Sequence, residues 1–151
     1  MNSLFALLLL ASTASAQMQA LAPRETFTAA KLSAGEIRQI ITGVERSAFD
    51  TPDSWETELR ARRVNLGAGP GLVVRGTKVL CGGTGNCQTW VFRKLSGRWV
   101  SLFEEGPMGE GFQLGPAVTR GIKDFTVITN MSAESSSPVI YKYDGRIYRA
   151  K

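Results

Sequence analysis

Cys81 and Cys87 are the residues of this chain whose type and spacing most directly suggest covalent chemistry. They are its only cysteines, and they enclose five residues, three of them glycine, in the stretch L-C-G-G-T-G-N-C-Q-T-W-V-F at Leu80–Phe92. Catalytic disulfides use C-x-x-C or a similarly short spacing, whereas this spacing is C-x5-C. Two cysteines in a chain without histidine cannot build a four-ligand metal site. We therefore predict a structural Cys81–Cys87 disulfide, with neither a metal ion nor a cofactor.

The carboxylates are the remaining candidates for catalysis, because histidine, the usual general base, is absent. They gather in two stretches: Asp50, Asp53, Glu56 and Glu58, then Glu104, Glu105 and Glu110. Hydrolysis of a sugar polymer needs two carboxyl groups facing each other across a cleft, and Glu56 and Glu58 would share one face of a strand. No G-x-S-x-G nucleophile motif accompanies them. We interpret both stretches as solvated strand ends, and Asp124 as a turn cap.

The formal net charge of +5 favours anionic surroundings such as phospholipid headgroups or cell-wall polymers. Lysine and arginine are spread along the chain, and the densest cluster, Arg60, Arg62 and Arg63, is short. The glycines at Gly82–Gly85 lack the lysine of a phosphate-binding loop. We therefore expect no nucleic-acid partner. The expected partner is an envelope component or an exported protein, with an anionic wall or membrane surface contributing.

The N-terminus has the features of a secretory signal peptide. Leu4–Ala11 is an unbroken apolar run, and Ala14-Ser15-Ala16 is an A-x-A cleavage site. The run is shorter than the ~20 residues of a membrane-spanning helix, so we do not expect an integral membrane protein. The alternative is a buried N-terminal helix. We predict a signal peptide at 1–16, a loose mature terminus at 17–32, and oxidised cysteines in an exported chain.

The rest of the chain, 33–151, is predicted to form a single disulfide-bearing domain. Ser33-Ala34-Gly35-Glu36 fits a capping box, and apolar residues at helical spacing predict an amphipathic helix from Ala34 to about Ser47. After Pro52 alternating β-rich runs predict strands. They are Trp55–Leu66, Gly71–Arg75, Cys87–Lys94, Arg98–Glu104, Gly111–Leu114, Phe125–Asn130, Pro138–Tyr143 and Arg146–Arg149.

Two hairpins and an internal repeat organise the predicted strands. Ser96-Gly97 and Asp144-Gly145 each separate two aromatic strands, and Asp-Gly is typical of a type I′ turn. Gly97-Arg98 and Gly145-Arg146 lie 48 residues apart. We predict a mainly β (α+β) fold, with one N-terminal amphipathic helix packed on an antiparallel β-meander. Whether the meander is two duplicated β units stays open.

Four motifs carry a resemblance to a known group. They are C-G-G-T-G-N-C-Q-T-W-V-F at Cys81–Phe92, G-R-W at Gly97–Trp99, G-I-K-D-F at Gly121–Phe125 and Y-K-Y-D-G-R-I-Y at Tyr141–Tyr148. Between Leu66 and Tyr148 the chain resembles a largely uncharacterised group of small exported bacterial proteins with a C-G-x-x-G-N-C-x-x-W motif. The resemblance implies export, the disulfide and a β-meander, and brings no activity.

A weaker likeness links the second half to FG-GAP or VCBS-type β repeats. Those repeats carry a D-x-D-x-D-G calcium loop. Only Asp144-Gly145 matches it here, so the likeness implies no calcium site.

Three functions are compatible with this sequence. We expect an exported, non-enzymatic binding or interaction module of the bacterial cell envelope. The first alternative is an inhibitor of an exported enzyme such as lysozyme, although a basic chain suits a basic target poorly. The second is a carboxylate-dependent polysaccharide hydrolase. A deep concavity with facing carboxylates would favour the hydrolase, a flat apolar patch the binding module, and a protruding loop the inhibitor.

Overall fold

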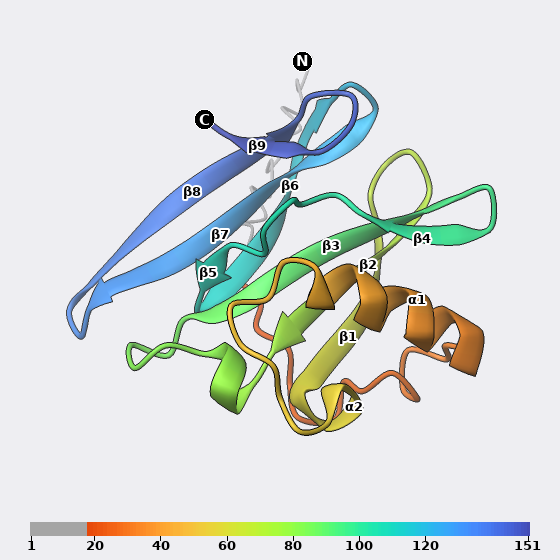
Figure 1. The fold of residues 1–151 in the computed structure, drawn as a ribbon. Helices are drawn as coiled ribbons and strands as arrows, with labels where there is room; N and C mark the ends of the chain where they lie inside the picture. The colour runs from red at the N-terminus through yellow and green to blue at the C-terminus, as the bar shows by residue number, and fades with distance from the viewer. Residues whose placement is uncertain (1–17) are drawn as a thin grey trace, which may run out of the picture.

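A computed structural model describes residues 18–151 of the chain. The predicted signal peptide at 1–16, with its cleavage site, lies outside the described residues. The elements are α1 (Ala34–Glu45), α2 (Trp55–Glu58), β1 (Leu59–Asn65), β2 (Pro70–Gly76), η1 (Lys78–Leu80), β3 (Cys87–Leu95), β4 (Arg98–Ser101), β5 (Met108–Gly109), β6 (Gly111–Thr119), β7 (Ile122–Ser132), β8 (Ser135–Tyr143) and β9 (Tyr148–Ala150) (Figure 1). The mainly β fold with one amphipathic helix confirms the predicted class, with the helix at residues 34–45 rather than at the N-terminus.

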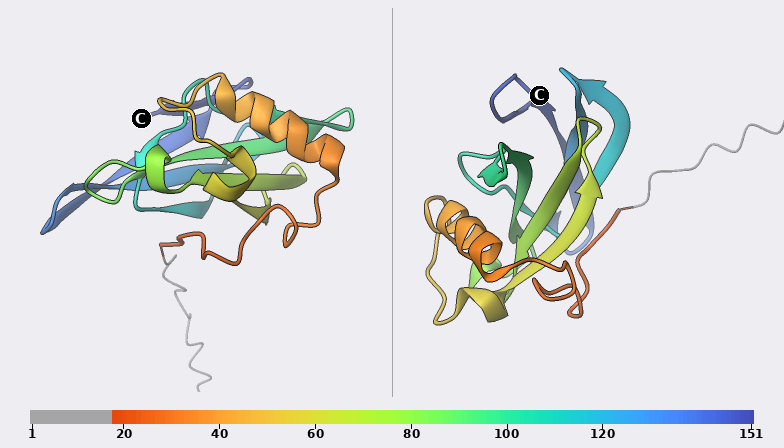
Figure 2. Two further views of the ribbon diagram at one scale, coloured as in Figure 1. Left: turned by 60° about the horizontal axis from the view of Figure 1, so that its bottom comes forward. Right: turned by 90° about the vertical axis from the view of Figure 1, so that its right-hand side faces the viewer.

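Two antiparallel sheets and α1 form three layers (Figure 2). The first sheet has the order β1-β2-β3-β4, with β5 also paired to β3, and the second has the order β6-β7-β8-β9. Strand β3 is buried on both faces from Cys87 to Phe92, because α1 covers one face of its sheet and the second sheet covers the other. Side-chain alternation divides its residues between two cores. Trp90 and Phe92 pack on the α1 side, and Val91 packs on the side of the second sheet.

Helix α1 begins at the predicted capping box. Ser33 Oγ accepts a hydrogen bond from Glu36 N at 3.3 Å, and Ser33 N donates to Glu36 Oε2 at 3.0 Å. The apolar stripe buries Ile40 and Val44 completely. A Cβ atom at Gly43 would lie 2.7 Å from Cε1 of Phe92, so glycine lets the helix approach β3 closely.

The segment at 18–32, which we expected to be loose, is anchored to both sheets. Gln19 and Phe112 exchange backbone hydrogen bonds of 2.8 Å, and Ala61 N donates to Glu25 O at 2.7 Å. Leu21 and Phe27 are buried. The expectation of a loose terminus was wrong because these two apolar side chains enter the two cores.

The strand predicted at Trp55–Leu66 is correct only from Leu59. Residues Trp55–Glu58 form one helical turn, in which Glu58 N donates to Ser54 O at 3.2 Å. The neighbouring strand β2 ends at Gly76, which pairs with Leu59, so no strand is present for the preceding residues to pair with. Likewise β4 ends at Ser101 instead of Glu104, where the Ser101 hydroxyl bonds to the backbone of Phe103.

The two predicted hairpins form, with different turns. Ser96 and Gly97 both have positive φ, 46° and 79°, as a type I′ turn requires. The second connection is a four-residue loop between Tyr143 and Tyr148, in which only Gly145 has positive φ. The type I′ prediction was wrong here because Asp144 Oδ1 instead accepts hydrogen bonds from Arg146 N and Ile147 N.

The two sheets contain four-stranded meanders with the same strand order. Strands β3 and β8 occupy equivalent places 48 residues apart, in agreement with the spacing of the repeat. Whether the two units arose by duplication stays open. No helix within residues 18–151 is long and apolar enough to cross a membrane.

Candidate functional site

Cys81 and Cys87 are joined by the predicted disulfide. The bond closes the glycine-rich loop between η1 and β3. Beside it, the Asn86 amide bonds to the backbone of Asn130 in β7, with both distances 2.8 Å. The loop therefore fastens the first sheet to the second, which is a structural role.

The candidate carboxylates do not form a facing pair. Glu56 and Glu58 lie in one helical turn rather than on a strand, so the basis for pairing them is wrong. Glu58 is buried and accepts hydrogen bonds from Lys78 Nζ at 2.8 Å and Thr77 Oγ1 at 2.7 Å, which lower its pKa. Asp124 is also buried, and it bonds to Thr119 Oγ1 at 2.6 Å. Within residues 18–151 no three His, Cys, Asp or Glu side chains gather as a metal site requires.

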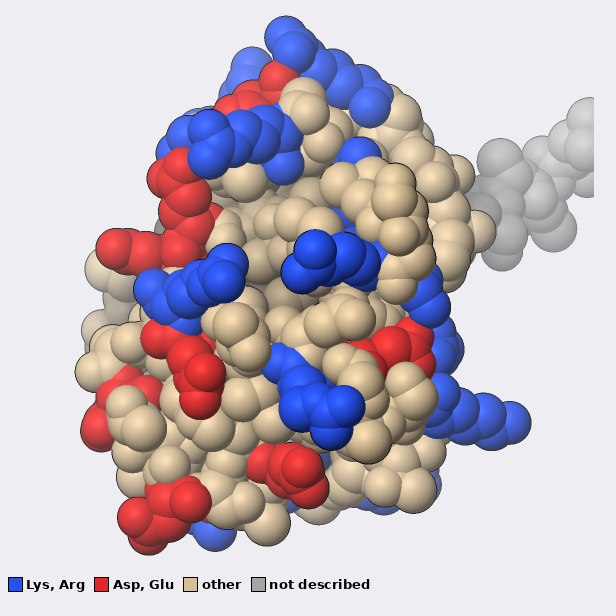
Figure 3. Space-filling view, turned by 45° about the vertical axis from the view of Figure 1, so that its right-hand side comes forward, with Lys and Arg blue, Asp and Glu red and all other residues tan. Residues whose placement is uncertain are grey.

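A groove of about 900 Å³ lies between α1, β4 and the β8–β9 loop. Four arginines border it, Arg38, Arg46, Arg98 and Arg146. We call it the arginine groove. Strand β4 lies between α1 and the β8–β9 loop (Figures 1 and 2), and lysine and arginine side chains surround a hollow on this side of the molecule (Figure 3).

Helix α1 forms one wall of the arginine groove. Arg38, Thr42 and Arg46 are spaced four residues apart, so they follow one face of the helix. That face is opposite to the buried Ile40 and Val44, and both arginines are exposed. Packing of the apolar stripe on the sheet therefore places two guanidinium groups along the wall.

The other two arginines follow turns. Arg98 is the first residue of β4, directly after the Ser96-Gly97 turn. Arg146 lies in the β8–β9 loop, where its backbone N–H donates to Asp144 Oδ1 at 2.7 Å. The two turns thus position cations on the floor and on the second wall of the groove.

None of the four groove guanidiniums forms an ion pair or hydrogen bond within residues 18–151. Glu104 is the only carboxylate among the described lining residues, and it pairs with Arg149 at 3.1 Å. An arginine stays charged at any physiological pH and presents a planar fork of five donors. The arrangement can therefore bind carboxylate, phosphate or sulfate groups.

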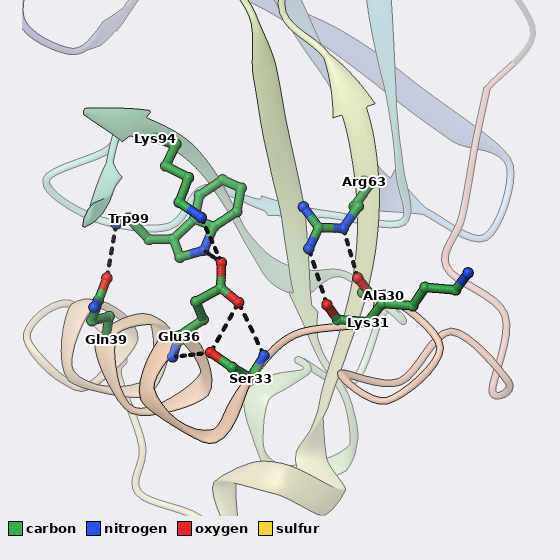
Figure 4. Close-up of polar contacts among 8 residues, drawn as sticks. All are labelled: Ala30, Lys31, Ser33, Glu36, Gln39, Arg63, Lys94 and Trp99. Atoms are coloured by element: carbon green, nitrogen blue, oxygen red, sulfur yellow. Dashed lines mark hydrogen bonds and ion pairs between the residues drawn. The ribbon is translucent and has the colours of Figure 1, made fainter. Parts of the chain in front are cut away.

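A network of hydrogen bonds fixes α1 against the β3–β4 hairpin beside this groove (Figure 4). Glu36 Oε1 accepts hydrogen bonds from Lys94 Nζ at 2.8 Å and Trp99 Nε1 at 3.1 Å. Gln39 Oε1 accepts one from Trp99 N at 2.9 Å. The bond from Lys94, followed by those from Ser33 and Trp99, lowers the pKa of Glu36 to about 2. The wall and floor of the groove are therefore held in a set position before any ligand binds.

Sequence reasoning singled out Arg60, Arg62 and Arg63, whose side chains are engaged elsewhere. Arg62 pairs with Glu25, and Arg63 donates to the carbonyls of Ala30 and Lys31 (Figure 4). The groove arginines come from three separate segments, so no local cluster reveals them. The usable signals are the four-residue spacing on the polar helix face and the two Gly-Arg pairs, which we had interpreted only as repeat markers.

Comparison with protein-family models, with curated proteins and with solved structures found no match to this chain.

Proposed function

We propose that this protein is an exported, non-enzymatic binding module of the bacterial cell envelope, and that it holds an anionic ligand in the arginine groove. The observation that carries the proposal is the gathering of four guanidinium groups without partners among the described residues around one concavity. A disulfide supports export, since such bonds persist in oxidising compartments.

The physical basis is charge-assisted hydrogen bonding. Guanidinium–carboxylate and guanidinium–phosphate pairs are often bidentate and about twice as strong as neutral hydrogen bonds. Because the groove is open to solvent, part of the attraction is screened by salt. A ligand with several anionic groups would contact arginines on both walls at once, which favours a polymer over a single small anion.

The inhibitor alternative keeps one supporting observation. The β7–β8 hairpin extends beyond the rest of the sheet (Figure 1). Its tip is exposed and carries a single carboxylate, Glu134. An inhibitor of a basic enzyme would need more negative charge there, so this hairpin supports the inhibitor function less than the arginine groove supports anion binding.

A pull-down on purified bacterial envelope tests the proposal. Wild-type protein should be retained at low salt and released at high salt. The double variant Arg38→Gln/Arg98→Gln should lose at least about tenfold in retention, since each lost charged hydrogen bond is worth about 1.5–3 kcal/mol.

The matched control is Arg24→Gln/Lys151→Gln, which removes two exposed charges outside the groove. It should retain binding within about twofold, since only long-range attraction is lost. Equal losses in both double variants would contradict a groove-specific function. Turnover of peptidoglycan or another polysaccharide that disappears on changing Glu56 or Glu58 would replace the proposal with the hydrolase.

A further inference from the structure

Strand β4 leaves one backbone edge open at the floor of the arginine groove. It pairs with β3 alone among the described strands. Leu102 N donates to Val91 O at 2.7 Å. This bond shows which residues of β4 direct their backbone groups toward β3. In an antiparallel ladder alternate residues direct their N–H and C=O groups away from the partner strand. Trp99 and Ser101 are therefore the residues of β4 whose backbone groups point outward.

One of these outward groups is already occupied. Trp99 N donates to Gln39 Oε1 at 2.9 Å, which shows that this edge faces the α1 wall. The N–H of Ser101 and the carbonyls of Trp99 and Ser101 have no hydrogen-bond partner within residues 18–151. All three groups belong to residues that line the groove.

We propose that the arginine groove binds an extended acidic segment of a partner protein, which adds to the open edge of β4 as a further strand. This inference rests on the proposed function, because it names the class of anionic ligand. Addition to a sheet edge is a recurring way to bind peptides, in which the backbone supplies affinity and the side chains supply specificity. Arg98–Ser101 spans about 13 Å at about 3.3 Å per residue, and the outward groups that Gln39 leaves free are the carbonyl of Trp99 and both backbone groups of Ser101.

The positions of the arginines select the side chains of the bound segment. Successive side chains of a strand point to opposite faces. A strand beside β4 would therefore direct alternate side chains toward Arg38 and Arg46 on α1, and the others toward Arg146 on the β8–β9 loop. Carboxylates on both faces would meet guanidinium groups, so acidic residues at consecutive positions fit this groove best. An acidic polysaccharide carries the charge but lacks the regularly spaced amide N–H and C=O groups that would pair with the edge of β4.

Two peptides of equal charge test the role of the backbone. The first is an acetylated and amidated peptide of eight consecutive Glu residues, which places carboxylates on both faces of a strand. The second is the same peptide with every backbone nitrogen methylated, which removes the donors from both edges and leaves the charge unchanged. Binding is measured by fluorescence anisotropy at low salt. The first peptide should bind at least about tenfold more tightly, the loss expected for a few backbone hydrogen bonds.

A matched pair of variants tests the same edge from the side of the protein. Ser101→Pro removes the outward N–H and keeps the ladder with β3, and proline is tolerated at such edge positions. Ser101→Ala removes the hydroxyl that bonds to Phe103, yet keeps the N–H. Peptide binding should fall about tenfold in Ser101→Pro and stay within about twofold in Ser101→Ala. Thermal melting shows whether both variants fold. If Ser101→Pro does not fold, the comparison of the two peptides on wild-type protein tests the proposal.

A linear polyuronate and vesicles of phosphatidylglycerol complete the design, because they offer charge without a peptide backbone. If the methylated peptide binds as tightly as the first, or if neither peptide binds while the polyuronate or the vesicles do, the edge-addition proposal is overturned and anion binding in the groove stands. If no anionic probe binds at low salt, both proposals fail.

Discussion

Replacing Glu36 by glutamine should weaken the contact that fixes α1 to the β3–β4 hairpin. The carboxylate accepts hydrogen bonds from Lys94 and Trp99, which lie on that hairpin (Figure 4). Its pKa falls from 4.5 to about 2, chiefly through the bond from Lys94. At about 1.36 kcal/mol per pKa unit, this lowering corresponds to at most about 3 kcal/mol. Because the side chains of Glu36 and Lys94 are 18% and 37% exposed, solvent screening reduces the expected loss to about 1–2 kcal/mol.

The effect should depend on pH in one direction. The pKa of Glu36 is lower in the folded than in the unfolded protein, so its stabilisation is complete above about pH 4.5 and is lost as pH falls toward 2. Glutamine has no charge at any pH, and protonated Glu36 resembles it. The difference in free energy of unfolding between wild type and Glu36→Gln should therefore be constant from pH 7 to pH 5 and shrink below that range.

Urea denaturation followed by tryptophan fluorescence at pH 7, 5, 4 and 3 measures this difference. Glu45→Gln serves as the control, because Glu45 is exposed on the same helix and forms no ion pair within residues 18–151. That control should change the free energy of unfolding by less than about 0.5 kcal/mol. A difference for Glu36→Gln that is equally large at pH 7 and pH 3 would show that the charge is not what holds the hairpin.

Two further predictions concern the disulfide and the packing of α1. The double change Cys81→Ala/Cys87→Ala should lower the free energy of unfolding by about 2–2.5 kcal/mol, which is the entropic contribution of closing a loop of about seven residues. The far-ultraviolet circular dichroism spectrum should stay unchanged. Loss of the β spectrum would show that the loop directs folding. Gly43→Ala should lower the melting temperature, since its Cβ would lie 2.7 Å from Phe92. Gly35→Ala, with no atom nearer than 4.0 Å, should raise the melting temperature or leave it unchanged, and equal effects at the two glycines would contradict the close packing.

The elements that local patterns encode were predictable from the sequence. The capping box located the start of α1, because its two hydrogen bonds involve residues only three positions apart. Likewise the Ser96-Gly97 turn and the disulfide depend on residues close in the chain. Each predicted strand overlaps an observed strand, with errors at the ends, since alternation of apolar side chains is a local signal.

The errors occurred where long-range contacts override the local pattern. Trp55–Glu58 alternates like a strand, yet β2 offers it no pairing partner beyond Gly76. The Arg120-Gly121 turn between β6 and β7 was missed, although both residues have positive φ, 51° and 83°. Arginine at the first position of such a turn is uncommon, so the local pattern did not indicate this turn.

The arginine groove could not be located from the sequence, because its walls come from segments about 50 to 100 residues apart. Only the packing of α1 beside β4, and of the second sheet behind it, brings them together. The net charge of +5 predicted an anionic partner, whereas the position of that charge required the fold. For the same reason the local cluster at Arg60–Arg63 was misleading, since two of its members bind the N-terminal segment.

The unpaired charges of the groove are not explained by the stability of the fold. Gathering like charges raises the free energy of the folded protein through mutual repulsion. Elsewhere arginine side chains hold the structure together, as Arg75 does by donating to the carbonyls of Gly109 and Glu110 at 2.9 and 3.0 Å. The groove arginines form no ion pair or side-chain hydrogen bond within residues 18–151. Helix α1 is instead fixed to the β3–β4 hairpin by Glu36 and Gln39. An anion that binds there would supply the missing counter-charge, reduce the repulsion and stabilise the folded chain by mass action.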